Sequence, residues 1–195
     1  MAAIRLIVGL GNPGPEYQNT RHNAGAWFIQ RLAERYDQTL SIESKFFGQT
    51  ARIQIANQDI RLLYPSTYMN KSGQSVAALA NFYRIPVESM LVAFDELDLP
   101  TGVAKFKVGG SSSQNGVRDI VASMANNRDF LRLRIGIGHP GHKSKVTGYV
   151  LGKPSKEDQE KMDDAIDEAI RSIDLLIQQD LVAAQQRLHS FNANN

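Results

Sequence analysis

The chain has 195 residues, of which 42% are hydrophobic and 22% are charged, and its formal net charge is +2 at pH 7. These values are ordinary for a soluble globular protein and leave room for one domain with a full core. The absence of cysteine excludes disulfides and thiol catalysis and favours a reducing cytoplasm, and no apolar run approaches the about 20 residues of a membrane span.

The first half of the chain alternates apolar runs with loops and one amphipathic segment. The N-terminus lacks a signal-peptide core and leads directly into a buried strand predicted over residues 4–10. Residues 9–20 are rich in Gly, Pro and Asn, which predicts a loop. Helical spacing of apolar residues predicts a helix over 23–35. Residues 46–55 and 59–64 are expected to form two strands of a hairpin.

The middle of the chain continues this alternation. A polar loop at 68–73 precedes a short predicted helix that ends before Pro86. Residues 90–94 form an apolar run typical of a buried strand, which delivers Asp95 at its carboxyl end. Residues 103–108 and 132–137 alternate apolar and basic side chains and are therefore predicted strands.

The remaining segments are helices and loops. Residues 109–116 predict a flexible polar loop, and 117–124 a short helix. Residues 139–150 carry few signals and are expected to be a loop. Ser155 is a predicted N-cap for a long helix whose apolar stripe faces the core. A last short helix is expected at 181–188, followed by a frayed tail over 190–195.

Strands that alternate with helices predict an α/β fold: a single three-layer domain over 1–195, with a twisted, mixed, mostly parallel sheet flanked by helices. In such sheets ligands bind beyond the carboxyl ends of the strands. Several polar side chains follow apolar segments, and we expect them to converge there: Asn12, His22, Asn70, Asp95 and Asn115.

The glycines at 9–14 match the G-x-G-x-x-G pattern of dinucleotide-binding folds. That fold requires a helix to begin within the motif, so that its N-terminal amides meet the pyrophosphate. Pro13, Gly14 and Pro15 oppose such a helix start, and Glu34 lies in a helical pattern rather than at the end of a second strand. A nucleotide-using small-molecule enzyme is therefore the least favoured function.

His22 lies where the polar loop meets the start of a predicted helix. A histidine there can stay partly neutral at pH 7 and act as a base, although a capping or core histidine fits the pattern equally well. A histidine base needs a partner that fixes its tautomer and stabilises its charged form. Asp95 is the best candidate, Glu96 is a weaker rival, and Asp98 is expected to shape a turn; a turn role would also explain Asp95.

No serine lies in a G-x-S-x-G context, and no histidine or acidic cluster has metal-ligand spacing. We therefore expect His22 to activate water directly, without a covalent intermediate, metal or cofactor. Asn12, Asn70 and Asn115 are loop-favouring residues that loop geometry alone would explain. As hydrogen-bond donors at a developing oxyanion, or as contacts to a peptide amide, they would instead serve catalysis.

Four basic residues alternate on the two predicted strands near the middle and end of the chain: Lys105, Lys107, Arg132 and Arg134. If those strands are neighbours, the four residues form a basic patch suited to phosphates. An ordinary solvated face is the competing interpretation.

Six motifs follow one another across nearly the whole chain: Gly9-Leu-Gly-Asn-Pro-Gly14, Tyr17-x-x-Thr-Arg-His-Asn-Ala-Gly25, Pro65-Ser-Thr-Tyr-Met-Asn-Lys-Ser-Gly73, Asp95-Glu-Leu-Asp-Leu-Pro100, Arg132-Leu-Arg-Ile-Gly-Ile-Gly-His-Pro-Gly141 and Val150-Leu-Gly-Lys-Pro154. Together they resemble the bacterial peptidyl-tRNA hydrolase family. The resemblance implies a monomeric α/β enzyme of the cytoplasm, without metal or cofactor. It would hydrolyse the ester that joins a peptide to the 3′ ribose of tRNA.

The resemblance also implies residue roles. His22 would be the catalytic base, Asp95 would stabilise its working form, and Asn12 would contact the peptide side of the substrate. The tRNA 3′ end would lie along one set of residues: Tyr17, Tyr68, Asn70 and Asn115. The tRNA phosphates would be held by Lys107 and Arg134.

The loop at 109–116 departs from the family pattern, which reads Gly-Gly-x-x-Gly-Gly-His-Asn-Gly. Here the loop is one residue shorter, Gln114 stands where a histidine is expected, and two glycines are missing. Glycine permits positive φ angles that Ser113 would resist, and glutamine cannot carry a proton near pH 7. We therefore expect weakened substrate positioning, and an RNA-binding homologue with impaired activity is the alternative function.

Overall fold

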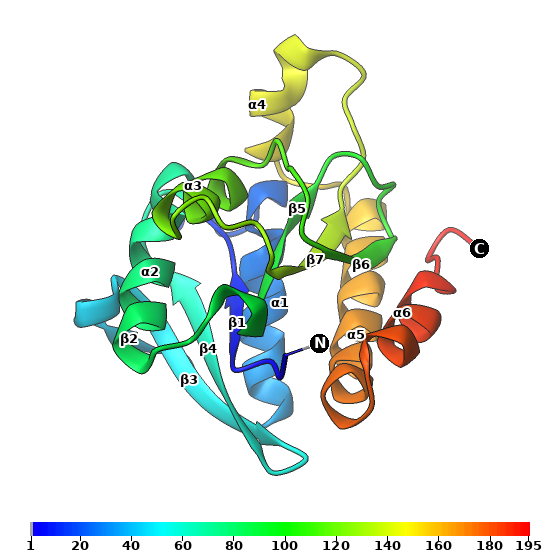
Figure 1. Cartoon of the computed structure of the whole chain (residues 1–195). Coiled ribbons are helices and arrows are strands. Elements are labelled where there is room, and N and C mark those ends of the chain that lie inside the picture. Colours follow the sequence, from blue (N-terminus) through cyan, green and yellow to red (C-terminus); the bar gives the residue numbers. More distant parts are fainter. Residues whose placement is uncertain (1) are drawn as a thin grey trace.

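The computed structural model describes residues 2–195 and contains a seven-stranded sheet with helices on both faces (Figure 1). The strand order is β2-β3-β4-β1-β5-β7-β6. The strands are β1 (Leu6–Gly9), β2 (Ser41–Glu43), β3 (Gly48–Ile55), β4 (Gln58–Pro65), β5 (Met90–Glu96), β6 (Ala104–Val108) and β7 (Leu131–Gly136). The four central strands are parallel, and both edges are antiparallel, which confirms the mixed sheet of the predicted α/β fold.

Two layers of helices enclose the sheet. The α-helices are α1 (Ala24–Arg35), α2 (Ser72–Tyr83), α3 (Asn115–Ser123), α4 (Val146–Val150), α5 (Lys156–Gln178) and α6 (Leu181–His189). Short 3-10 turns are η1 (Arg21–Asn23), η2 (Ser44–Phe46), η3 (Met69–Lys71), η4 (Val87–Ser89) and η5 (Lys143–Lys145). Helices α1, α5 and α6 pack on one face, and α2 and α3 on the other, so the sheet has a hydrophobic core on each side.

Strand β5 shows how this burial fixes the direction of a functional side chain. Leu91 and Ala93 point into the core under α1, whereas Val92 and Phe94 point into the core under α2 and α3. Successive side chains on a strand face opposite sides, which explains why the run is apolar throughout. The same alternation places Asp95 on the α1 side, toward η1.

Helix α1 approaches the sheet closely because two glycines meet at its N-terminal end. A Cβ on Gly25 would lie 2.3 Å from the carbonyl oxygen of Ala93 in β5. A Cβ on Gly9 would lie 2.2 Å from the carbonyl oxygen of Gly25. The absence of both side chains therefore lets η1, which precedes α1, sit directly beside the end of β5.

Several predicted elements are confirmed. The hairpin between β3 and β4 turns at Ala56 and Asn57, both of which have positive φ, and its strands pair in register from Gly48↔Pro65 to Ile55↔Gln58. Ser155 caps α5 by accepting a hydrogen bond from the Asp158 amide. The predicted apolar stripe of that helix is buried.

Other predictions of local structure are wrong. The segment expected to be a loop over 139–150 contains η5 and α4, and the short edge strand β2 was not predicted. Helices α2 and α3 begin at Ser72 and Asn115, within stretches expected to be loops. Both of these helices start on polar residues, so apolar periodicity did not detect their first turns.

The chain end after α6 is attached to the body of the molecule rather than free as expected for 190–195. The amide of Ala193 donates to Gly102, and the Asn194 side chain donates to Thr101, at 3.1 and 2.8 Å respectively. Among residues 2–195, no helix has both the length and the apolar character needed to cross a bilayer.

The contact between Gly25 and β5 gives a first prediction. Gly25→Ala should lower the free energy of unfolding by about 1–3 kcal/mol, because the added methyl group must displace α1 from the sheet. Urea unfolding followed by circular dichroism measures this loss. Gly148→Ala is the control: its Cβ would meet nothing within 4 Å, so its unfolding midpoint should stay near the parent value or rise slightly. Equal midpoints for both variants would contradict the close approach.

Candidate active site

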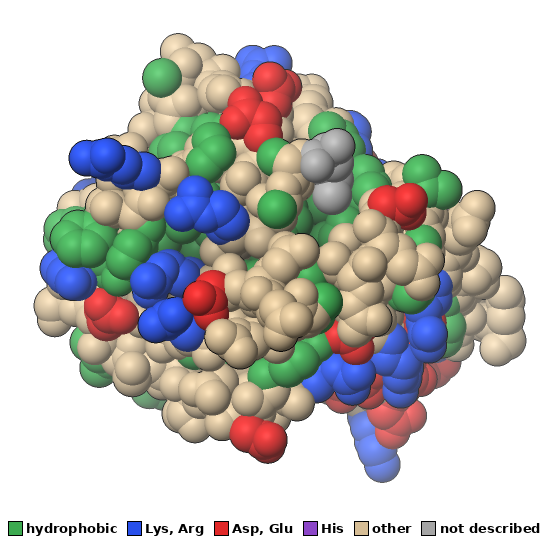
Figure 2. Space-filling view, turned by 60° about the horizontal axis from the view of Figure 1, so that its bottom comes forward, with side chains coloured by type: hydrophobic (Ala, Val, Ile, Leu, Met, Phe, Trp, Pro, Cys, Tyr) green, Lys and Arg blue, Asp and Glu red, His purple; other side chains and the backbone are tan. Residues whose placement is uncertain are grey.

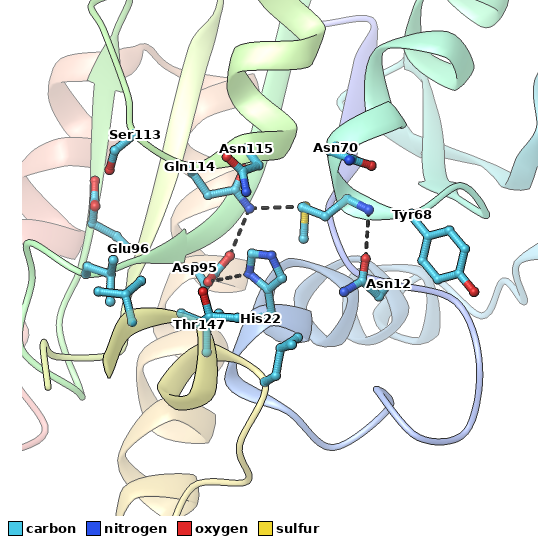
Figure 3. A pocket seen from close by; sticks show the side chains of 15 residues that line it. Asn12, His22, Tyr68, Asn70, Asp95, Glu96, Ser113, Gln114, Asn115 and Thr147 are labelled. Carbon is cyan, nitrogen blue, oxygen red and sulfur yellow. Dashed lines mark hydrogen bonds and ion pairs between the residues drawn. The ribbon is translucent and has the colours of Figure 1, made fainter. Parts of the chain in front are cut away.

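A pocket opens beyond the carboxyl ends of the parallel strands, as the α/β fold predicts. Its walls come from the loop after β1, η1, η3, the end of β5, the start of α3, and α4 (Figure 3). The polar residues that line it include five predicted to converge: Asn12, His22, Asn70, Asp95 and Asn115.

When the bottom of Figure 1 is turned forward, the visible surface shows lysine and arginine among apolar side chains but no histidine (Figure 2).

His22 and Asp95 form the central contact of the pocket. His22 Nδ1 lies 2.8 Å from Asp95 Oδ2, across 73 residues of sequence. Asp95 is only 3% exposed, so this carboxylate depends on its protein partners for the hydrogen bonds that water would otherwise supply. The second ring nitrogen of His22 faces the pocket, away from Asp95 (Figure 3). The predicted pairing of these two side chains is therefore present.

Two opposing effects act on the pKa of His22. Burial disfavours the charged ring and lowers the pKa, while the charge of Asp95 and its hydrogen bond raise it. The effects of Asp95 prevail, so the pKa of His22 lies above its ordinary value of 6.5. The imidazolium form is therefore stabilised here, as expected where a histidine must accept a proton during a reaction.

Gln114, which was expected to be a defect, takes part in this arrangement. Its side-chain nitrogen donates to Asp95 Oδ1 at 2.9 Å. Its side-chain oxygen accepts from the amide of Val117 at 2.9 Å and so caps α3. Each carboxylate oxygen of Asp95 therefore has its own partner.

The shortened loop is also less strained than expected. Positive φ angles occur at Gly109 and Gly110 but not at Ser113, so the serine does not need the conformation that it would resist. The loop keeps glycine at the two positions where its path requires glycine.

Asn12 is held in one orientation by its neighbours. Its side-chain oxygen accepts from the Met69 amide at 2.7 Å, which turns its nitrogen toward the side of the pocket that holds His22 (Figure 3). Its backbone is fixed by a reciprocal pair of hydrogen bonds with the Asn23 side chain, at 2.9 and 3.0 Å. Asn12 thus offers an oriented donor to the pocket.

The other predicted binding residues lie at the rim. Tyr68 is 58% exposed, and its ring meets that of Tyr17 edge to face, with 6.4 Å between centroids. Tyr68, Asn70 and Asn115 line the pocket, whereas Tyr17 reaches it only through Tyr68. The two tyrosines form an aromatic surface beside Asn12.

The four basic residues lie on neighbouring strands, which was the condition for a basic patch, but they differ in exposure. Lys105 pairs in register with Arg134, and Lys107 with Arg132. Arg132 is 1% exposed and donates to the carbonyl oxygens of Gly109, Gly110 and Arg128, so including it in an accessible patch was wrong.

Arg134 and Lys107 line a second pocket beside the first, together with Arg118, which the sequence did not single out. Arg134 forms an ion pair with Glu96 at 2.8 Å. That pair explains why Glu96 does not compete with Asp95 for His22. Glu96 and Ser113 line both pockets, so the basic side chains lie directly beside the histidine site.

The far wall of the main pocket comes from the segment wrongly expected to be a loop. Helix α4 and its end contribute Val146, Thr147, Val150 and Leu151. They are mainly apolar and give no catalytic signal in the sequence, although the motif that begins at Val150 marked the segment. Within residues 2–195, no group of three or more His, Asp or Glu side chains could hold a metal ion.

Comparison with known proteins gives a consistent result. The family model described as "Peptidyl-tRNA hydrolase" matches residues 6–195. A peptidyl-tRNA hydrolase of Alteromonas mediterranea is 72% identical over 97% of this chain and 98% of its own length. One of Pseudoalteromonas atlantica is 67% identical over 99% and 100%. The crystal structure of peptidyl-tRNA hydrolase from Acinetobacter baumannii superposes with a TM-score of 0.95 at 49% identity, covering 99% of this chain and 98% of that one.

The opposing effects on His22 give a second prediction. Asp95→Asn removes the charge that raises the pKa and leaves burial acting, so the pKa of His22 should fall below 6.5. Titration of the ring protons by NMR measures this change. His189, on α6, is the internal control, and its titration should not move. A His22 pKa that is unchanged in the variant would show that Asp95 does not stabilise the imidazolium.

Proposed function

Because the chain belongs to the peptidyl-tRNA hydrolase family, we propose that it hydrolyses the ester between a peptide and the 3′ ribose of tRNA in the pocket around His22. The observation that carries this assignment is the 2.8 Å contact between His22 Nδ1 and Asp95 Oδ2, which leaves the other ring nitrogen facing the pocket (Figure 3). A nitrogen so placed can accept a proton from water.

The proposed reaction begins with His22 neutral: Nδ1 keeps its proton and donates a hydrogen bond to the Asp95 carboxylate. Nε2 takes a proton from a water molecule as the water oxygen attacks the ester carbonyl carbon. The tetrahedral intermediate then expels the ribose oxygen, which takes the proton back from His22. The products are a peptide with a free carboxyl group and a tRNA with a free 3′ hydroxyl, and the enzyme returns to its starting state.

Asp95 contributes by stabilising the ring while it carries the extra proton. The Nδ1 contact fixes the tautomer with the lone pair on Nε2, on the pocket side. A base positioned in this way typically accelerates such a reaction by about 10²–10⁴-fold.

Asn12 is the proposed contact for the peptide side of the ester. Its nitrogen is aimed into the pocket because Met69 holds its oxygen. That nitrogen can donate to a peptide carbonyl or to the oxyanion that forms during attack. A free aminoacyl group lacks the preceding peptide carbonyl, so such a contact would favour peptidyl over aminoacyl substrates.

The tRNA end is proposed to enter over the aromatic rim. Tyr68 and Tyr17 offer surfaces on which the terminal bases can stack, and Asn70 and Asn115 offer hydrogen bonds to base or ribose. Lys107 and Arg134, in the adjoining pocket, are placed to meet phosphates of the acceptor stem. Arg134 would keep its ion pair with Glu96 while it contacts an RNA phosphate. We expect the enzyme to act as a monomer in the cytoplasm.

The alternative of an RNA-binding homologue with impaired turnover has lost its main support. That alternative depended on the altered 109–116 loop weakening the site. Gln114, which stands where the family has a histidine, instead lines the pocket and donates to Asp95. Hydrolysis is therefore the function that this geometry supports best.

Replacing the base gives a third prediction. His22→Ala should lower single-turnover hydrolysis of N-acetylaminoacyl-tRNA by about 10²–10⁴-fold, because it removes the positioned base that takes the proton from water. Binding of a non-hydrolysable analogue with an amide in place of the ester should stay within a few-fold of the parent value. An equal loss of binding and turnover would mean that His22 is structural.

A fourth prediction concerns the phosphate contacts. Lys107→Ala should weaken tRNA binding and reduce the slope of log K against log salt by about 1, the value expected for one lost phosphate contact. Lys45→Ala is the matched control: its amine lies over the Phe46 ring on η2, and its salt slope should match the parent. If both lysines give the same slope change, the basic pocket has no special role in binding.

A further inference from the structure

Gln114 is a buried polar side chain that lines the pocket and that the reaction described above does not use. It is 9% exposed and lies at the junction between the 109–116 loop and α3. It reaches three neighbours. Its nitrogen lies 2.9 Å from Asp95 Oδ1 and 3.1 Å from Met69 Sδ (Figure 3). Its oxygen accepts from the Val117 amide. These contacts go beyond what a helix cap requires.

The orientation of the Gln114 amide is fixed by what surrounds it. The Val117 amide can only donate, so it must face the glutamine oxygen; the Asp95 carboxylate can only accept, so it must face the nitrogen. Rotating the amide by half a turn would place donor against donor and acceptor against acceptor. Helix α3 therefore holds the donor that is aimed at Asp95.

This donor completes the coordination of the carboxylate. Asp95 Oδ2 contacts His22 Nδ1 and Oδ1 contacts Gln114, so a rotation of the carboxyl group about its Cβ–Cγ bond would break two contacts at once. A carboxylate fixed at both oxygens keeps the histidine ring at one angle, with Nε2 toward the substrate. Without Gln114, the His22 contact would be the one side-chain hydrogen bond left to Asp95 among residues 2–195.

We propose that Gln114 is a positioning residue for the hydrolysis: through one amide it couples the N-terminus of α3 to Asp95 and so holds His22 in its working orientation. This inference rests on the proposed function. The amide also stays neutral at every pH at which the enzyme works, so the donor to Asp95 is present whatever the protonation of its neighbours. An imidazole at this place would have to lose its cap acceptor when it becomes protonated.

The charges around this group come from several elements. The ionisable side chains lining the same pocket are His22, Tyr68, Asp95 and Glu96. Glu96 is paired with Arg134. The adjoining pocket adds Asp98 and further basic side chains, namely Lys107, Arg118 and Arg132. Among the described residues, Asp95 is thus the ionisable side chain that hydrogen-bonds directly to the Gln114 side chain, and His22 is joined to it through Asp95.

Two variants separate positioning from helix capping. Gln114→Glu keeps the oxygen that caps α3 but replaces the donor with a second carboxylate beside Asp95. Gln114→Met keeps the length and neutrality of the side chain but removes both functions. Gln186→Glu, on the exposed surface of α6, is the matched control for the change of charge.

The measurements are the pH dependence of kcat and KM with N-acetylaminoacyl-tRNA, together with thermal unfolding of each variant. A positioning role predicts that both Gln114 variants lose about 10- to 100-fold in plateau kcat, the change that corresponds to one lost hydrogen bond to a charged group. KM should change little. The Glu variant should also show the ascending limb of its pH profile at higher pH, because added negative charge stabilises the His22 imidazolium.

A purely capping role predicts a different pattern. Gln114→Glu would then match the parent in plateau kcat, and Gln114→Met would lose thermal stability without loss of kcat in the folded enzyme. Either result would overturn the proposal. A rise in KM alone in both variants would also overturn it, since it would make Gln114 a substrate contact.

The His22→Ala variant, assayed beside them, separates a failure of the proposed base from a failure of the positioning role. If His22→Ala keeps its turnover, the proposed base is wrong, whatever the Gln114 variants do. If His22→Ala loses turnover and Gln114→Glu behaves as the parent and the Gln186→Glu control do, only the positioning role is wrong.

Discussion

The site depends on one buried contact between an imidazole and a carboxylate. Taking the Asp95 carboxylate out of water costs several kcal/mol unless other groups replace its hydration. Two groups do so, and each comes from a different segment: His22 from η1 and Gln114 from the start of α3. The contact therefore ties the chain together at residues 22, 95 and 114, and the ring receives enough stabilisation from Asp95 to raise its pKa despite burial.

Two features of the fold bring His22 and Asp95 together: the burial of β5 and the close packing of α1 on the sheet. Asp95 lies at the end of a strand buried on both faces, so its position is fixed by the packing of Leu91 to Phe94. His22 reaches it because Gly9 and Gly25 let α1 press against the sheet. The basic face of β6 and β7 then supplies cations beside the pocket. Arg132 is buried there under the 109–110 loop, to whose carbonyl oxygens it donates, whereas Lys107 is exposed. Rigid elements thus carry the proposed base and its partner, and the residues proposed to bind tRNA lie at the exposed rim.

Much of this arrangement could be predicted from the sequence, and the failures have physical reasons. Apolar runs and helical stripes predicted the sheet, α1 and α5, because burial dictates those patterns. The convergence of His22 and Asp95 followed from the rule that parallel strands present their carboxyl ends together. Helix α4 was missed because its five residues show no usable periodicity. Arg132 was misjudged because alternation assigns a face to a side chain and cannot tell whether a loop folds over that face. Gln114 was expected to weaken the site because glutamine cannot carry a proton. In the structure its amide nitrogen donates to Asp95 and its amide oxygen accepts from Val117. The sequence alone does not show these two partners.

The central claim is that the neutral ring of His22 is the group that removes the proton from water. The most direct test compares two titrations of the same enzyme: the single-turnover rate of N-acetylaminoacyl-tRNA hydrolysis against pH, and the ring-proton shifts of His22 against pH by NMR. If His22 is the base, the rate rises with pH along the same curve as deprotonation of His22, with a midpoint above 6.5. A rate that stays constant across that titration, or that follows a different midpoint, would contradict it.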